Sequence, residues 1–360
     1  MFKPITRRVL ASLAVLIPTV LLSACSDNDS QAVSYPELPY LTSLEQARVT
    51  VSGFSSGGYL ANQLHLAYPE KIEGVAIFSA GPWGCAIKGL SHALMSCMQT
   101  RFPIASLEER MAIMHRASRN GEIGDLALVV DDPVYIFYGQ SDRVVKPSIS
   151  ESLIGFYQTL VASYNIRITA IPEAGHAFPT LSSDNDCGDP DANHLQNCHF
   201  DGAGEALRVL YGPLQIPTSS DQLKGEFLEF GQNAFFDGKG MLDRGYLYLP
   251  ESCKSGAASC QLHVVFHGCD QSAEAIGNQF FRSSGYNRWA DNNNLVLLYP
   301  QARKSLPNPQ GCWDWWGYEK DQFYSRDNQQ LAAIIRMIER LKGDDQKNAA
   351  GRMKQADGSQ

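Results

Sequence analysis

The feature that most constrains this chain is a Gly-x-Ser-x-Gly string set between a strand pattern and a helix pattern. Gly53-Phe54-Ser55-Ser56-Gly57 follows the β-branched run 48–52 and precedes the helix-like residues 58–68. A serine on such a strand-to-helix turn presents its hydroxyl to a substrate, and the flanking glycines let strand and helix pass closely. The pattern predicts a nucleophile elbow at Ser55, with a Gly/Ser-rich turn without chemistry as the alternative.

Strand-like and helical segments alternate along the chain. Strand patterns occupy residues 47–52, 72–79, 133–138, 166–171, 243–249, 261–266 and 295–299, and helical patterns occupy 57–68, 105–118, 148–163, 202–210, 272–292 and 327–342. This alternation predicts an α/β fold with a mostly parallel central sheet and helices on both faces. In such sheets, functional groups gather at the carboxyl ends of the strands.

Two residues at such strand ends are candidate partners of Ser55. Asp142 follows the strand pattern 134–138, and His176 follows the strand pattern 166–171. The order Ser55, Asp142, His176 is that of α/β-hydrolases, in which the histidine is the general base and the aspartate orients it. The alternatives are a turn or cap role for Asp142 and an ordinary surface position for His176.

The oxyanion of such a reaction needs two backbone N–H donors, and the residue after the nucleophile, Ser56, supplies one. Only a short segment precedes Ser55, so the second donor is expected elsewhere. Far downstream, the buried strand pattern 261–266 runs into His267-Gly268-Cys269-Asp270-Gln271. This loop is the expected source of the second donor.

The string His-Gly-Cys-x-Gln resembles the oxyanion loop of poly(3-hydroxybutyrate) depolymerases and related esterases. Residues 311–316 resemble that family's Cys-Trp-x-Trp segment, 52–58 its lipase box, and 197–204 with 210–213 the region after its catalytic histidine. The resemblance covers roughly residues 47–342. In most of the family the His-Gly-Cys block precedes the serine. Its position after the histidine here resembles the circularly permuted, single-domain fungal type.

The resemblance implies an α/β-hydrolase fold in permuted order and specific roles for several residues. Ser55, Asp142 and His176 would form the triad, and the amides of Ser56 and Cys269 would form the oxyanion hole. His267 would shape the loop, and His263 would be a sheet residue. No cofactor and no metal are expected, because these groups supply the nucleophile, the base and the charge stabilisation.

The resemblance also implies a substrate class, namely short-chain hydroxyalkanoate polyesters or their oligomers. The sequence shows no Thr-rich linker with a separate substrate-binding domain, so surface aromatics are expected to contact the polymer. Trp313, Trp315 and Trp316 are the candidates, with core packing as the alternative. Two other functions stay open: a carbohydrate esterase of feruloyl or acetyl-xylan type, and a non-catalytic surface lipoprotein that binds polymer.

The ends of the chain are expected to lie outside the catalytic domain. A basic start precedes the apolar residues 9–22, and Leu22-Ser23-Ala24-Cys25 resembles the lipobox of bacterial lipoproteins. We expect a signal peptide over 1–24, lipidation of Cys25, a tether over 25–43, a catalytic domain over 44–342 and a disordered tail over 343–360. Outer-membrane or surface anchoring follows. An ordinary secretory signal is the alternative.

Cysteine usage and charge agree with export. Apart from Cys25, eight cysteines remain, an even number in a chain sent to an oxidising compartment. We expect nearest-neighbour disulfides, Cys85–Cys97, Cys187–Cys198, Cys253–Cys260 and Cys269–Cys312. A zinc cluster of Cys187, His194, Cys198 and His199 is the rival, but its spacing matches no standard finger. The formal charge of −8 argues against nucleic acid, and no protein partner is evident.

Overall fold

An eight-stranded sheet lies at the centre of the protein, in a computed structural model that describes residues 34–189 and 194–345. The strands run in the order β4-β3-β2-β1-β9-β10-β8-β7, and β5 and β6 form a separate short pair. All pairs from β4 to β10 are parallel, whereas β8 is antiparallel to both β10 and β7. The predicted mostly parallel sheet is confirmed. The strands are β1 (Val49–Phe54), β2 (Val75–Phe78), β3 (Val134–Gly139), β4 (Ile166–Ile171), β5 (Phe178–Pro179), β6 (Leu195–Gln196), β7 (Glu226–Gly231), β8 (Arg244–Leu249), β9 (Gln261–Phe266) and β10 (Leu295–Tyr299).

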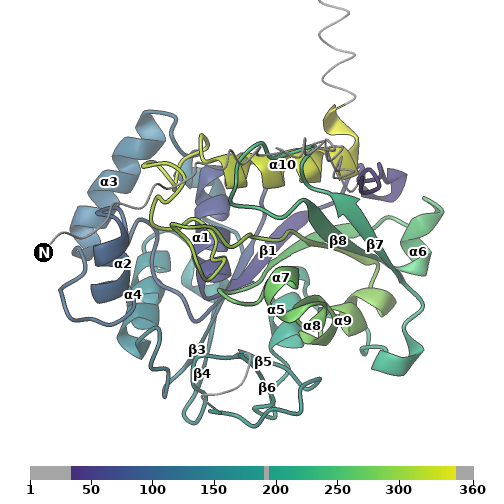
Figure 1. Ribbon diagram of the computed structural model, residues 1–360, viewed down its shortest axis with the longest axis horizontal. Helices are drawn as coiled ribbons and strands as arrows, with labels where there is room; N and C mark the ends of the chain where they lie inside the picture. Colours follow the sequence, from purple (N-terminus) through teal and green to yellow (C-terminus); the bar gives the residue numbers. More distant parts are fainter. Residues whose placement is uncertain (1–33, 190–193, 346–360) are drawn as a thin grey trace, which may run out of the picture. The chain divides into compact units, whose positions relative to one another are not determined.

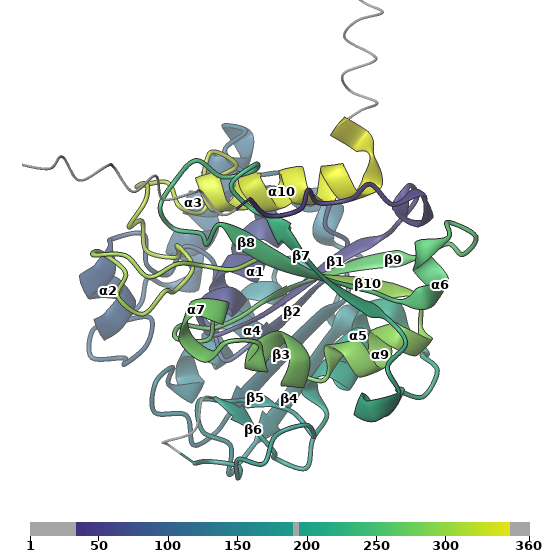
Figure 2. The ribbon, with the colours of Figure 1, turned by 45° about the vertical axis from the view of Figure 1, so that its right-hand side comes forward.

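Helices cover both faces of this sheet. Helices α1, α4 and α10 pack on one face, and α5, α8 and α9 pack on the other (Figures 1 and 2). The helices are α1 (Ser56–Ala67), α2 (Leu90–Met95), α3 (Leu107–Arg119), α4 (Pro147–Tyr157), α5 (Gly202–Tyr211), α6 (Glu251–Lys254), α7 (Ala273–Ile276), α8 (Gln279–Ser283), α9 (Tyr286–Asn292) and α10 (Gln329–Lys342). The 3-10 helices are η1 (Thr42–Leu44), η2 (Leu126–Val129), η3 (Ser163–Asn165) and η4 (Ser220–Gln222).

The two layers create two hydrophobic cores, and the central strands feed both. In β2, Val75 and Ile77 enter the core under α1 and α10, while Ala76 and Phe78 enter the core under α5 and α9. Successive side chains of a strand point to opposite faces. A strand covered on both faces therefore reads as a continuous apolar run, which is why the sequence identifies these strands so clearly.

Strands from distant parts of the sequence meet at the centre of the sheet. Strand β1, which leads to Ser55, pairs in parallel with β9, with Val49 opposite Leu262 and Gly53 opposite Phe266. Both strands therefore end at the same edge. The loop 267–271 consequently emerges beside the turn that carries Ser55, as the sequence predicts.

The ends of the described chain also meet. The Leu41 amide donates to the Leu341 carbonyl (2.9 Å), and Lys342 Nζ donates to the Ala47 carbonyl (2.8 Å). Leu38 and Leu41 are buried in the core under α10. The tether predicted over residues 25–43 therefore extends too far along the chain, because these two leucines bury apolar surface in the folded unit that begins at Tyr35.

Some elements differ from the sequence prediction. The helical pattern 272–292 is three short helices, because Gly277 (φ 61°) and Gly285 (φ 93°) adopt conformations that interrupt a helix. Strand β7, at the exposed edge, was not predicted. Among the described residues no helix has the length and apolar character needed to cross a membrane. The predicted signal peptide 1–24, lipidation at Cys25 and residues 346–360 of the predicted tail lie outside the described residues.

Candidate active site

Ser55 occupies a strained turn between β1 and α1. Its backbone adopts φ 56° and ψ −120°, a region that non-glycine residues rarely enter. The neighbouring glycines are required by close backbone approach: a Cβ on Gly53 would lie 2.0 Å from the Gly57 carbonyl oxygen, and one on Gly57 would lie 2.4 Å from the His267 carbonyl oxygen. The turn thus has the geometry of a nucleophile elbow.

His176 and Asp142 lie in line with this serine. His176 Nε2 is 2.9 Å from Ser55 Oγ, and His176 Nδ1 is 2.7 Å from Asp142 Oδ2. With Nδ1–H donating to the carboxylate, Nε2 is free to accept the serine hydroxyl. All three residues are buried, with exposed fractions of 8% for Ser55 and His176 and 3% for Asp142.

The loops that carry these residues follow parallel strands of the sheet. Asp142 stands three residues after β3, and its Oδ1 accepts the amides of Val144 (2.8 Å) and Val145 (2.9 Å). One carboxylate oxygen therefore caps its own loop while the other faces His176. Asp142 therefore has both roles: it caps its own turn, as the alternative proposed, and it contacts His176.

The two candidate oxyanion amides, of Ser56 and Cys269, lie on segments next to the turn of Ser55. Among the described residues, neither the Ser56 N–H nor the Cys269 N–H donates to a backbone carbonyl outside the regular helices and strands. Ser56 is the first residue of α1, where helix amides have no partner within the helix. The loop with Cys269 follows β9 and packs on the elbow through Gly57. This arrangement suits a developing oxyanion.

His267 holds that loop in place. Its Nδ1–H donates to the Gly268 carbonyl (2.6 Å), and its Nε2 accepts the Ala302 amide (3.0 Å). Burial lowers the pKa of His267 to about 4, so the ring is neutral at physiological pH. Its contacts are those of a loop-shaping residue, as expected.

His263 is a sheet residue, also as expected. Its ring nitrogens contact Thr50 Oγ1 (2.7 Å) and Ser52 Oγ (2.9 Å) on the neighbouring strand β1. Burial lowers the pKa of His263 to about 3. A neutral ring that bridges two hydroxyls has no reach to a substrate.

The four disulfides pair as expected: Cys85–Cys97, Cys187–Cys198, Cys253–Cys260 and Cys269–Cys312. The Cys187–Cys198 bond takes both sulfurs that the alternative zinc cluster would have needed. The described residues contain no group of three or more His, Cys, Asp or Glu side chains arranged to hold a metal ion. The Cys269–Cys312 bond ties the loop of the second amide donor to the tryptophan-rich segment 313–316.

The predicted substrate-binding tryptophans differ in position. Trp313 has no exposed surface and donates its indole N–H to the His267 carbonyl (3.0 Å), so its assignment as a substrate contact is wrong. Its apolar ring packs under the loop instead. Trp315 is 5% exposed and stacks on Tyr59, with ring centroids 4.0 Å apart. Trp316 is partly exposed in a groove, and substrate contact by Trp315 and Trp316 stays a prediction.

His194 is a neighbour of the candidate site that the sequence placed only in a possible zinc cluster. Its Nδ1–H donates to the His176 carbonyl (2.9 Å), and its ring centroid lies 5.4 Å from that of His176. His194 adopts φ 63°, in the left-handed region that non-glycine residues seldom enter. Burial, followed by the nearby His176, lowers the pKa of His194. No sequence motif marks this residue.

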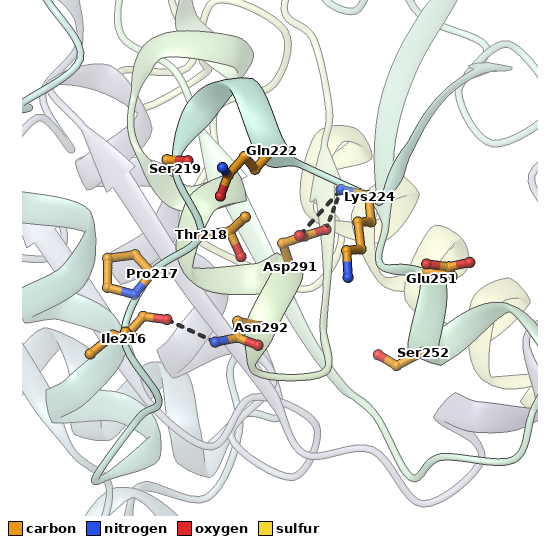
Figure 3. A pocket seen from close by; sticks show the side chains of 10 residues that line it. All are labelled: Ile216, Pro217, Thr218, Ser219, Gln222, Lys224, Glu251, Ser252, Asp291 and Asn292. Atoms are coloured by element: carbon orange, nitrogen blue, oxygen red, sulfur yellow. Dashed lines mark hydrogen bonds between the residues drawn. The ribbon is translucent and has the colours of Figure 1, made fainter.

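Two cavities differ in their relation to these groups. A cavity of about 480 Å³ borders His176 and His194. Figure 3 shows the side chains that line a second cavity, of about 890 Å³. One of them is Asn292, the last residue of α9, which lies just before the start of β10. The cavity therefore lies at the opposite edge of the sheet from Ser55. Its Asp291 already accepts the amides of Lys224 and Gly225, so this cavity offers no chemistry to the serine.

Comparison with known proteins gives a consistent result. The chain is 36% identical over 314 residues to poly(3-hydroxybutyrate) depolymerase of Delftia acidovorans, covering 86% of this chain and 62% of that protein. It is 37% identical over 308 residues to polyhydroxybutyrate depolymerase of Talaromyces funiculosus, covering 81% and 89%. A solved PHB depolymerase in complex with an R3HB trimer matches with a TM-score of 0.79 and 34% identity, covering 85% of this chain and 99% of that one. No protein-family model matches the chain.

Proposed function

The chain belongs to the family of polyhydroxybutyrate depolymerases, with their α/β-hydrolase fold, and we propose that it is a serine esterase that hydrolyses poly(3-hydroxybutyrate) or related short-chain hydroxyalkanoate polyesters and oligomers. One observation carries the proposal: the hydrogen-bonded line from Ser55 Oγ through His176 to Asp142, at 2.9 and 2.7 Å. This line supports a general-base mechanism that needs no cofactor.

The first half of the reaction forms an acyl-enzyme. His176 Nε2 takes the hydroxyl proton of Ser55 as Oγ bonds to the ester carbonyl carbon, and the carbonyl oxygen becomes an oxyanion. The amides of Ser56 and Cys269 stabilise its charge. The tetrahedral intermediate then breaks the carbon–oxygen bond to the alcohol half of the polyester. The protonated His176 gives its proton to that departing oxygen.

The second half repeats the sequence with water. His176 takes a proton from the water as its oxygen bonds to the acyl carbon, and the same two amides stabilise the second oxyanion. The bond to Ser55 Oγ breaks, and His176 returns the proton to the serine. Asp142 stabilises the imidazolium in both halves without becoming protonated. The products are an alcohol end and a carboxylic acid end.

The cysteines and the first residues of the chain support a proposal for the location of the enzyme. Four disulfides indicate export to an oxidising compartment. We propose further that residues 1–24 are a signal peptide and that Cys25 is lipidated and anchors the catalytic domain, assigned to 44–342, to the outer membrane. An anchored enzyme suits soluble oligomers that reach the cell better than a free polymer granule.

Product analysis tests this function. The purified protein is incubated with hydroxybutyrate polymer, with hydroxybutyrate oligomers and with feruloylated xylan, and the products are identified by mass spectrometry. Release of hydroxybutyrate units from polymer or oligomers by the wild type, but not by Ser55→Ala, is the expected result. Release of ferulate alone would instead assign a carbohydrate esterase, and no product from any substrate would leave a polymer-binding lipoprotein.

A further inference from the structure

A short segment between α2 and α3 connects the helix of the nucleophile to the loop of the acid. Tyr59, one turn into α1, donates its hydroxyl to the Cys97 carbonyl (2.6 Å). Two residues after Cys97, Gln99 reaches the loop that carries Asp142. Between these contacts, the Lys146 amide donates to the Met98 carbonyl (2.9 Å). The Cys85–Cys97 disulfide closes the loop that precedes this segment.

Gln99 makes two hydrogen bonds that point at the acid. Its Nε2 donates to the carbonyls of Arg143 (2.8 Å) and Val144 (2.9 Å). Because both partners are carbonyl oxygens, the amide nitrogen of Gln99, and not its oxygen, must face them. The side chain of Gln99 is half-buried, so its two hydrogen bonds lie near the protein surface.

Those two carbonyls belong to the peptide groups that hold Asp142. The Arg143 carbonyl shares a peptide plane with the Val144 N–H, and the Val144 carbonyl shares one with the Val145 N–H. These two N–H groups donate to Asp142 Oδ1 at 2.8 and 2.9 Å. A donor on the carbonyl side of a peptide group fixes that plane and polarises the N–H on its other side. Gln99 thus acts on both donors of the carboxylate at once.

We propose that Gln99 is a positioning residue for Asp142, an inference that rests on the proposed esterase function. By fixing two peptide planes it holds Oδ1, and so directs Oδ2 toward His176 Nδ1. The segment 97–99 also contacts the helix of Ser55 through Tyr59 and so couples the placement of the acid to that of the nucleophile. Gln99 itself touches neither substrate nor His176.

The test compares variants that keep or remove the donor. Gln99→Met keeps the length of the side chain and removes the N–H groups, whereas Gln99→Lys keeps donors on a flexible stem. The matched control is Asn293→Leu. Asn293 is also half-buried, and its Nδ2 donates to two main-chain carbonyls, of Trp289 (2.8 Å) and Gln215 (3.1 Å), near the cavity of Figure 3. Each variant is assayed for kcat/KM with p-nitrophenyl butyrate and for thermal unfolding.

Gln99→Met should lower kcat/KM by about 10- to 100-fold, the scale of an ångström-sized misplacement in an active site. Gln99→Lys should recover most of that loss, and Asn293→Leu should leave kcat/KM unchanged. The low-field NMR signal of the proton between His176 Nδ1 and Asp142 Oδ2 should broaden in Gln99→Met only. Should Gln99→Met fail to fold, Gln99→Glu, which has the same shape and no N–H, replaces it.

Three results would overturn the inference: a kcat/KM of Gln99→Met equal to that of the control, a Gln99→Lys variant less active than Gln99→Met, or an unchanged NMR signal. The first result would show that the hydrogen bonds of Gln99 do not affect turnover, and the second that packing, and not hydrogen bonding, matters at this position. Failure of the proposed function is a separate outcome. In that case the wild type itself would lack ester turnover that depends on Ser55, before any Gln99 variant is compared.

Discussion

The Cys269–Cys312 disulfide offers a sharp test of how the oxyanion hole is held. Cys269 contributes a candidate oxyanion N–H from its backbone, while its side chain is bonded to the residue before Trp313. We predict that Cys312→Ser lowers kcat as well as stability. As a comparison, a Cys260→Ser variant removes the Cys253–Cys260 bond, which lies before β9 and far from Ser55, and should lower mainly stability.

The magnitudes follow from the loops that the two bonds close. Cys269 and Cys312 are 43 residues apart, for which the chain-entropy model gives about 4 kcal/mol of stabilisation. Cys253 and Cys260 are 7 residues apart, for which it gives about 2.4 kcal/mol. Loss of one oxyanion donor costs about 10² to 10³ in turnover, which is the ceiling for the kcat effect. His267 and Trp313 still hold the loop, so we expect a drop of at least about tenfold within that ceiling.

The assay is kcat for a soluble short-chain ester such as p-nitrophenyl butyrate, at a temperature where both variants remain folded by circular dichroism. We predict a lower kcat in Cys312→Ser than in Cys260→Ser. Equal kcat values in the two variants would refute the coupling between the disulfide and the donor. Peptide mapping that pairs Cys269 with another cysteine would remove its premise.

Three further predictions address the nucleophile, the anchor and a partly buried acid. Ser55→Ala should lower ester turnover by several orders of magnitude. If Ser52→Ala abolishes activity while Ser55→Ala keeps it, the assignment of Ser55 as the nucleophile is wrong. Cys25→Ser should release the protein from membranes in fractionation, because attachment loses its acyl chains; an unmodified N-terminus in the native protein would contradict lipidation. Burial, and then Asp314, raise the pKa of Glu319 from 4.5 to about 7. The folded protein therefore favours the protonated carboxyl, and the stability that this form gives is present below pH 4.5 and is lost as the pH rises to about 7. Glu319→Gln should therefore raise the melting temperature at pH 8 and leave it unchanged at pH 4, and equal changes at both pH values would contradict this assignment.

The sequence predicts the centre of this fold well because its signals are local. The parallel strands are buried on both faces and read as apolar runs, and the elbow requires glycines at 53 and 57 for close backbone approach. The placement of Asp142 and His176 follows from one rule, that parallel strands end at a common edge. The adjacency of β1 and β9, in contrast, was inferred from the need for a second oxyanion donor and from family resemblance, since no local pattern encodes it.

The remaining features depend on tertiary contacts that no short pattern records. The local sequence around Leu38 and Leu41 is that of a polar tether, and their burial depends on packing into the core under α10. The sequence does not distinguish Trp313 from a surface aromatic, because its burial depends on packing against the loop of His267. Gln99 lies in a segment without any motif, and its relevance appears only when the carbonyls that it contacts are traced to Asp142.

The central claim is that Ser55 forms a covalent acyl-enzyme with a hydroxyalkanoate ester. The most direct measurement is rapid acid quenching of the enzyme during turnover of a hydroxybutyrate oligomer, followed by peptide mapping by mass spectrometry. We predict that hydroxybutyryl mass is added to the peptide that contains Ser55, at that residue, and that the addition is absent in Ser55→Ala. Oligomer cleavage that continues in Ser55→Ala, or acylation at Ser52 or Ser56 instead, would contradict it.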